Sequence, residues 1–312
     1  MSKKQTKRYP LRVFGAKALL RFLAWLPIGK ARALGAFVGT LAVWFGSRHA
    51  DFTRANLAHC YPNLTAQELA DFTRKSVIES AKTSAEMGAA YLWKHKRVLE
   101  LITHIENEAL LDDAIAQKRG VILLAPHIGN WEIMGHFMAH KGQGRFITLY
   151  KPPKIADLEP LLKAARDGAG MISLPTNQKG IVRLFRELGN GALTAILPDQ
   201  QPARKAGGVF APFFGKPALT ATLFSKAIEK TGALAVCGVA LRDDKGFSLH
   251  FLEVDQELYS SDEQTSVAAL NRSVERCIAL APAQYTWEYK RFRIQENGED
   301  IYSKERRTKT DD

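Results

Sequence analysis

Cysteine is scarce in this sequence, and its spacing excludes the structures that cysteine usually builds. The three residues, Cys60, Cys237 and Cys277, lie far apart and form no closely spaced pair. Zinc sites and small disulfide scaffolds depend on short or regular cysteine spacings, so neither is expected. We interpret these residues as buried, reduced thiols of a protein that faces the cytoplasm.

Long uninterrupted apolar runs are also absent. A basic leader, Met1–Arg12, precedes the apolar segment Val13–Ile28, which Lys17, Arg21 and Pro27 interrupt, so a signal peptide is not indicated. A second apolar run, Ala33–Ser47, would reach roughly 22 Å as a helix, short of the ~30 Å hydrocarbon core of a bilayer. A full membrane span is therefore not secure.

Both segments fit better as amphipathic helices that lie in a membrane interface. Their cations suit anionic headgroups, and their aromatic residues suit the acyl boundary. These aromatic residues are Phe14, Phe22, Trp25, Phe37, Trp44 and Phe45. The alternative is a pair of ordinary core helices in a soluble protein.

Acidic residues are too few to balance the basic ones. The chain has 44 Lys and Arg against 32 Asp and Glu, a net charge of +12. This surplus favours an anionic partner, although a simply solvated basic surface has the same composition. No helix-turn-helix, RNP or zinc-finger pattern accompanies the charge, so we expect no nucleic-acid partner. Glycine-rich nucleotide motifs and internal repeats are absent as well.

The pattern of apolar segments predicts an α/β fold with a mixed, largely parallel sheet flanked by helices, preceded by the N-terminal membrane-associated helices. Thr65–Glu68 is a capping box that opens a long helix, Asp243–Gly246 predicts a hairpin turn, and Gln264–Ala281 predicts a final helix. We divide the chain into residues 1–48 (membrane-associated helices), 49–294 (main domain) and 295–312 (a charged tail expected to be disordered). The strand candidates are Leu101–Ile105, Val121–Ala125, Phe146–Tyr150, Met171–Leu174, Leu193–Leu197, Leu234–Ala240 and Phe247–Val254.

The stretch Val121–His140 carries the best candidates for chemistry. An apolar strand is followed by a short break, and then by Asn130, a good N-cap for the next helix. His127 would lie in the loop and Glu132 in the first helical turn, so the imidazole can turn back onto the carboxylate. This pair resembles a general base and the acid that orients it. The alternative is a polar loop histidine beside an acid that favours the helix dipole.

A metal site is a competing interpretation of the same stretch. Glu132, His136 and His140 share one helix face at intervals of four residues, but the glutamate that usually follows the first histidine of a zinc helix is missing. We therefore expect no metal and no other cofactor.

The segment His127-Ile128-Gly129-Asn130-Trp131-Glu132 resembles the His-x-x-x-x-Asp/Glu signature of glycerolipid and lipid A acyltransferases. Further matches follow in order over about residues 45 to 293, and together they resemble the bacterial late acyltransferases of lipid A, the lauroyl/myristoyltransferase group. The matching segments are Arg54–Leu57, Cys60–Pro62, Leu149–Pro153, Ile196–Gln200, Gly207–Gly215, Pro282–Trp287 and Lys290–Phe292.

The resemblance implies transfer of a fatty acyl chain from acyl carrier protein to a hydroxyl of a phosphorylated lipid A precursor, at the cytoplasmic face of the inner membrane. His127 would take the proton from the acceptor hydroxyl, and Glu132 would orient the ring and stabilise the imidazolium. The amides of Ile128–Asn130 would stabilise the oxyanion.

Other residues are expected to bind the substrates. Lys151 stands where the family often has arginine, and Arg166 is a second candidate for the acceptor's phosphate or sugar, with a solvated helix-terminal cation as its alternative. Asp199 would order the loop at the sheet edge, or pair with a cation such as Arg204. Gly207–Gly215 is expected to be a shaped loop, either a wall of the acyl tunnel or simple core packing.

Two further functions stay open at this point. The enzyme could acylate another acceptor, such as a lysophospholipid or a glycolipid mannoside. A non-catalytic module that binds membranes or acidic proteins could also retain this fold.

Overall fold

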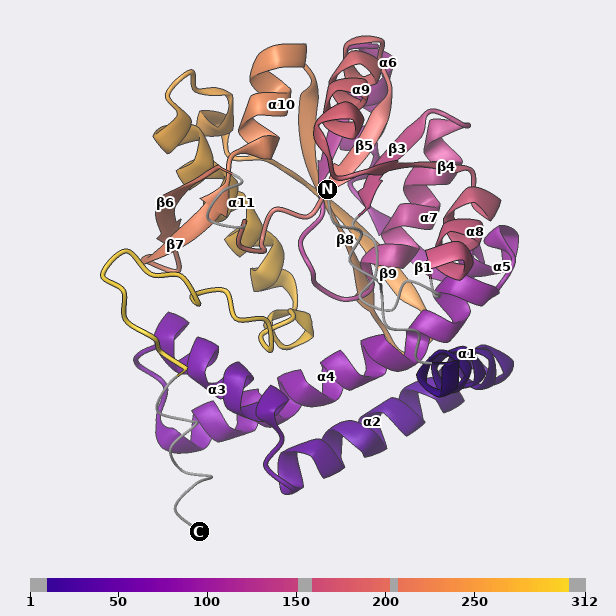
Figure 1. Cartoon of the computed structure of the whole chain (residues 1–312), viewed down its shortest axis with the longest axis vertical. Coiled ribbons are helices and arrows are strands. Elements are labelled where there is room, and N and C mark those ends of the chain that lie inside the picture. Colours follow the sequence, from indigo (N-terminus) through magenta and orange to yellow (C-terminus); the bar gives the residue numbers. More distant parts are fainter. Residues whose placement is uncertain (1–9, 151–158, 203–206, 303–312) are drawn as a thin grey trace.

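Seven strands form one mixed sheet at the centre of the molecule (Figure 1). The computed structural model describes residues 10–150, 159–202 and 207–302. The strand order is β1-β9-β8-β2-β5-β3-β4, and every neighbouring pair in this sheet is parallel except β8–β9. This confirms the predicted sheet. The strands are β1 (Ile102–Glu106), β2 (Val121–Leu124), β3 (Phe146–Tyr150), β4 (Met171–Pro175), β5 (Leu193–Ile196), β8 (Leu234–Arg242) and β9 (Phe247–Glu253).

Helices cover both faces of the sheet, and β2 shows why its sequence is apolar throughout. Successive side chains of a strand point to opposite faces, so a strand covered on both sides must be apolar at every position. Ile122 and Leu124 pack in the cluster with α9, α10 and α11, whereas Val121 and Leu123 pack in the cluster with α6 and α7. The helices are α6 (Glu108–Ala116), α7 (Trp131–Gly142), α9 (Gln178–Gly189), α10 (Leu223–Thr231) and α11 (Glu263–Leu280).

Four N-terminal helices lie beside one edge of the sheet (Figure 1). The long helix α4 begins at the predicted capping box, in which Thr65 and Glu68 exchange backbone–side-chain hydrogen bonds. Helix α2 packs so closely against α4 that a Cβ on Gly35 would lie 2.7 Å from the carbonyl oxygen of Ala81. The four helices are α1 (Pro10–Trp25), α2 (Ile28–Trp44), α3 (Arg48–Cys60) and α4 (Ala66–Leu92).

Helices α1 and α2 confirm the two predicted N-terminal helices and leave large apolar side chains uncovered. All six aromatic residues singled out in the sequence are exposed, with Trp25 and Trp44 each 78% accessible. Among the described residues no single helix is long and apolar enough to cross a bilayer. The pair formed by α2 and α3 passes the same test jointly, but it is bent by 79°.

Two predictions near the C-terminal half differ from the structure. Part of Gly207–Gly215, expected to be a loop, forms strand β6 (Gly208–Phe213), which pairs in a hairpin with β7 (Lys216–Ala221). Its Phe213 is buried in the core, which supports the core-packing alternative at this position. The predicted disordered tail is ordered at least to Tyr302, which is fully buried and donates its hydroxyl to Asn56. Residues 303–312 of that tail lie outside the described part of the chain.

Candidate functional site

His127 and Asp199 meet because their strands are neighbours in register. Leu124, the last residue of β2, pairs with Ile196, the last residue of β5. His127 and Asp199 each follow three residues later, so both lie beyond the carboxyl edge of the sheet. Clefts at this edge are where α/β proteins commonly bind ligands.

The contacts between these two side chains fix the chemistry of the imidazole. Asp199 Oδ1 lies 2.8 Å from His127 Nδ1, and its Oδ2 accepts from the His127 backbone amide at 2.9 Å. Burial acts to raise the pKa of Asp199, but the contacts with His127 outweigh it, so this pKa lies below its usual value. An ionised carboxylate needs a donor, so Nδ1 carries the proton and Nε2 of the neutral ring has the free lone pair. His127 can therefore accept a proton at Nε2.

Glu132 does not make the contact with His127 that its spacing predicted. Its Oε1 instead accepts from Arg166 Nη2 at 2.7 Å and from the Tyr91 hydroxyl at 2.9 Å. Burial acts to lower the pKa of Arg166, but Glu132 raises it above the usual value, so the guanidinium stays charged. Helix α8 (Glu159–Gly168) supplies Arg166. The expected role of Glu132 as the acid that orients the ring is thus corrected, because Asp199 occupies that position.

The amides expected to stabilise an oxyanion already donate to backbone carbonyls. Ile128 N–H donates to Pro126, Gly129 N–H to Gln284, and Asn130 N–H to Ala240, at 2.8, 3.0 and 2.9 Å. This prediction is therefore wrong. The C-terminal segment also fixes the loop from outside, since Thr286 N–H donates to the carbonyl of His127 at 3.0 Å.

Asn130 is confirmed as the N-cap of α7 but does not face a substrate. Its side chain accepts from the backbone amide of Ile133 and donates to Glu86 Oε2 at 3.1 Å. The residue is fully buried, so its predicted role in substrate binding is corrected to a structural one. Lys151, which together with Arg166 was expected to bind the acceptor's phosphate, lies outside the described residues.

Glu86 belongs to a buried ionic network that ties the N-terminal helices to the site. Arg242 at the end of β8 donates to both carboxylate oxygens of Glu86, at 2.6 and 2.8 Å. It also donates to Glu79, which lies about two turns earlier on the same helix, α4. Arg32 of α2 donates to Glu86 at 2.6 Å and to the carbonyls of Asp243 and Gly246. The network therefore joins α2, α4, β8 and the cap of α7.

The histidines of α7 do not form the metal site considered above. His136 Nε2 donates to the carbonyl of Ala90 at 2.9 Å, its Nδ1 lies 3.0 Å from His95 Nδ1, and burial lowers its pKa. Glu132 faces Arg166 instead. Within residues 10–150, 159–202 and 207–302, no three His, Cys, Asp or Glu side chains are placed to hold a metal ion.

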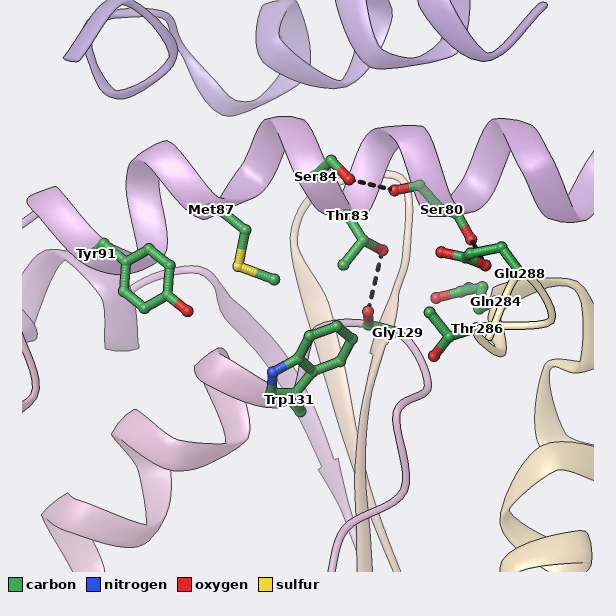
Figure 2. Close-up of a pocket in the computed structure, with 10 residues that line it drawn as sticks. All are labelled: Ser80, Thr83, Ser84, Met87, Tyr91, Gly129, Trp131, Gln284, Thr286 and Glu288. Carbon is green, nitrogen blue, oxygen red and sulfur yellow. Dashed lines mark hydrogen bonds between the residues drawn. The ribbon is translucent and has the colours of Figure 1, made fainter. Parts of the chain in front are cut away.

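A cavity of about 290 Å³ lies between α4 and the loop that follows β2 (Figure 2). One end is lined by Met87, Tyr91 and Trp131, and the other by polar residues that include Ser80 and Glu288. Ser80 donates to Glu288 at 2.8 Å, and burial raises the pKa of this carboxyl group. The ring of Trp131 also contacts His127 edge-on, with centroids 4.9 Å apart, so the cavity adjoins the base.

Sequence reasoning missed two residues at this site. Tyr91 is partly buried on α4 and donates to Glu132, and Gln200 places its Nε2 3.2 Å from His127 Nε2. Gln200 follows Asp199 directly, so its position beyond β5 was a signal that could have identified it. Tyr91 gave no such signal, because it lies within an ordinary helical pattern.

Comparison with known proteins identifies the family to which the chain belongs. The family described as bacterial lipid A biosynthesis acyltransferase matches residues 1–294. The lipid A biosynthesis lauroyltransferase of Escherichia coli is 28% identical over 283 residues, 90% of either chain. The palmitoleoyltransferase of the same organism is 28% identical over 94% of both chains. A phosphatidylinositol mannoside acyltransferase of Mycobacterium tuberculosis is also 28% identical, but over only 39% of each chain. The chain therefore belongs to the bacterial lipid A biosynthesis acyltransferase family.

Proposed function

We propose that this protein transfers a fatty acyl chain from acyl carrier protein to a hydroxyl of a phosphorylated lipid A precursor. The observation that carries the proposal is the His127–Asp199 pair, which places the lone pair of the imidazole on Nε2, where it can accept a proton. The acceptor hydroxyl gives that proton to Nε2 as its oxygen attacks the thioester carbonyl. The tetrahedral intermediate then expels the thiolate, which takes the proton back from the imidazolium. No serine or cysteine nucleophile is required.

Charge supports the proposed partners. Acyl carrier protein, a phosphorylated acceptor and the inner membrane are all anionic, and the chain carries a net charge of +12. Arg166 retains guanidinium donors beyond the one that binds Glu132, and its side chain is 24% accessible. We assign the Arg166–Glu132 pair to positioning the acceptor's phosphate or sugar.

The test is an assay of the purified protein with a dodecanoyl thioester of acyl carrier protein and three acceptors. These are a lipid A precursor, a lysophospholipid and a phosphatidylinositol mannoside. We expect transfer to the lipid A precursor alone, because relatives named for lipid A match nearly the whole chain. Transfer only to another acceptor, or to none, would contradict the proposal. The last result would favour a non-catalytic binding module.

Asp199 and Glu132 should affect different kinetic constants. Asp199→Asn removes the charge that stabilises the imidazolium, so we expect kcat to fall at least about tenfold with little change in KM. Glu132→Gln releases Arg166, so we expect the KM for the acceptor to rise about tenfold. Steady-state kinetics with varied acceptor separate the two. If Glu132→Gln lowered kcat and Asp199→Asn did not, the carboxylate roles would be reversed.

We also propose that α1 and α2 bind the cytoplasmic face of the inner membrane. This proposal rests on the exposed aromatic side chains of the two helices. The double variant Trp25→Ser/Trp44→Ser should weaken binding to vesicles of anionic phospholipid about tenfold or more, because two large apolar groups no longer enter the interface. Co-sedimentation measures this binding. Tyr259→Ser, an exposed aromatic residue outside these helices, serves as the control. Equal binding of the double variant and wild type would refute a membrane role for the two helices.

A further inference from the structure

Gln200 lies where the acceptor hydroxyl has to arrive. Its Nε2 is 3.2 Å from Nε2 of His127, which is the only ring nitrogen with a free lone pair once Nδ1 donates to Asp199. Two nitrogens at this distance need one donor and one acceptor, so the carboxamide N–H donates and the imidazole accepts. The resting base is therefore capped by Gln200, and a hydroxyl that reaches Nε2 must displace it.

The loop around His127 leaves the developing oxyanion without its expected donors. The amides of Ile128, Gly129 and Asn130 are bound to internal carbonyls, and the amide of His127 is bound to Asp199. Acyl transfer nevertheless needs a donor where the thioester oxygen gains charge. Among the described residues, Gln200 has a side-chain N–H group within hydrogen-bond distance of His127 Nε2.

Resting on the function proposed above, we propose that Gln200 caps His127 in the resting enzyme and donates to the thioester oxyanion after the acceptor hydroxyl displaces it. The acceptor oxygen that replaces Gln200 at Nε2 forms its new bond to the thioester carbon. The oxyanion is attached to that same carbon, so it forms close to the position that Gln200 has left. A carboxamide on an exposed side chain reaches that position by rotation of its own torsions. The proton moves from the hydroxyl to Nε2, the new C–O bond forms, and the carbonyl electron pair becomes the oxyanion held by Gln200. Collapse of the intermediate breaks the C–S bond.

Gln200→Ala removes the donor and should lower kcat by ~10²–10³-fold, while the KM of donor and acceptor changes by less than about threefold. Gln200→Asn keeps the carboxamide on a side chain one methylene shorter and should recover part of the lost kcat. Gln117→Ala, an exposed glutamine that follows α6, is the matched control and should behave as wild type. Retention of kcat by Gln200→Ala, or a loss confined to KM, would overturn the proposal.

Gln200→Glu tests the resting contact separately. A carboxylate at this position accepts from the protonated ring, so the acid limb of the kcat/KM profile should move to higher pH by ~1–3 units. Asp199 and Glu288 are carboxyl groups whose pKa values His127 acts to lower, and both residues stay unchanged in this variant. A purely structural role of Gln200 would leave the acid limb in place, and that result would refute the capping contact.

The two proposals can fail separately. If the wild-type protein transfers no acyl chain, the proposed function is wrong, and NMR titration of the ¹⁵N-labelled imidazole of His127 still tests the cap without substrate. The His127 signal is assigned by its loss in His127→Ala. Gln200→Glu should move the titration midpoint of that signal to higher pH, and an unchanged midpoint would exclude the contact. If wild type is active and Gln200→Ala is equally active, only the role of Gln200 falls.

Discussion

Replacing His127 by alanine should lower the rate of acyl transfer by ~10²–10⁴-fold, because no other base within the described residues is placed to take the acceptor's proton. The imidazole is held by Asp199 on one side and by Gln200 on the other, and its backbone carbonyl is fixed by Thr286. The alanine variant keeps those backbone contacts. We therefore expect the loss to appear in kcat with the fold intact, as measured with the thioester and lipid A precursor assay.

A matched histidine provides the control. His104 is exposed on β1, a strand other than the one that precedes the His127 loop, so His104→Ala should retain wild-type activity. Circular dichroism and vesicle binding of His127→Ala should equal those of wild type. If the variant were active, the proposed mechanism would be wrong. If it failed to fold, His127 would be a structural residue.

Replacing Arg242 by methionine should destabilise the protein by about 3–5 kcal/mol, because it removes the buried cation that Glu86 and Glu79 share. Arg242 binds Glu86 and Glu79 and also donates to Thr83, and its side chain is 5% accessible. Burial acts to lower the pKa of Arg242, but these acids raise it, so the charge is kept. Methionine fills a similar volume, which confines the effect mainly to the lost charge.

Arg272 offers the same substitution in an exposed setting. It pairs with Asp255 and Glu257 at the surface, with 43% of its side chain accessible. Exposed pairs contribute only ~0–1 kcal/mol, so Arg272→Met should shift the urea midpoint far less than Arg242→Met. Similar shifts for the two variants would show that the buried network adds little to stability.

The fold was largely predictable because its signals are local. The strands β2 and β5 are short apolar runs, and Asn130 begins α7 because its side chain satisfies an amide of the first helical turn. The β6–β7 hairpin was missed since proline and glycine residues favour loops in isolation. Burial of Phe213 in the core stabilises strand β6 in its pairing with β7.

The site was less predictable, because it depends on which strands are neighbours. The sequence singled out His127 correctly as a candidate base, but spacing along the chain favoured Glu132 as its partner. The pairing of β2 with β5 brings Asp199 to Nδ1 across 72 residues of sequence. Glu132 is turned to Arg166 by the first turn of α7, and nothing in the local pattern specifies that direction.

The hydrogen bond from Thr286 to the carbonyl of His127 has a consequence for biosynthesis. Ile128 and Tyr285 form a β-bridge at the same point, so residues more than 150 positions later in the sequence complete the loop around His127. A nascent chain leaves the ribosome from its N-terminus, and α1 and α2 are therefore available long before residue 286 emerges. The base acquires its final support only after Thr286 has been translated.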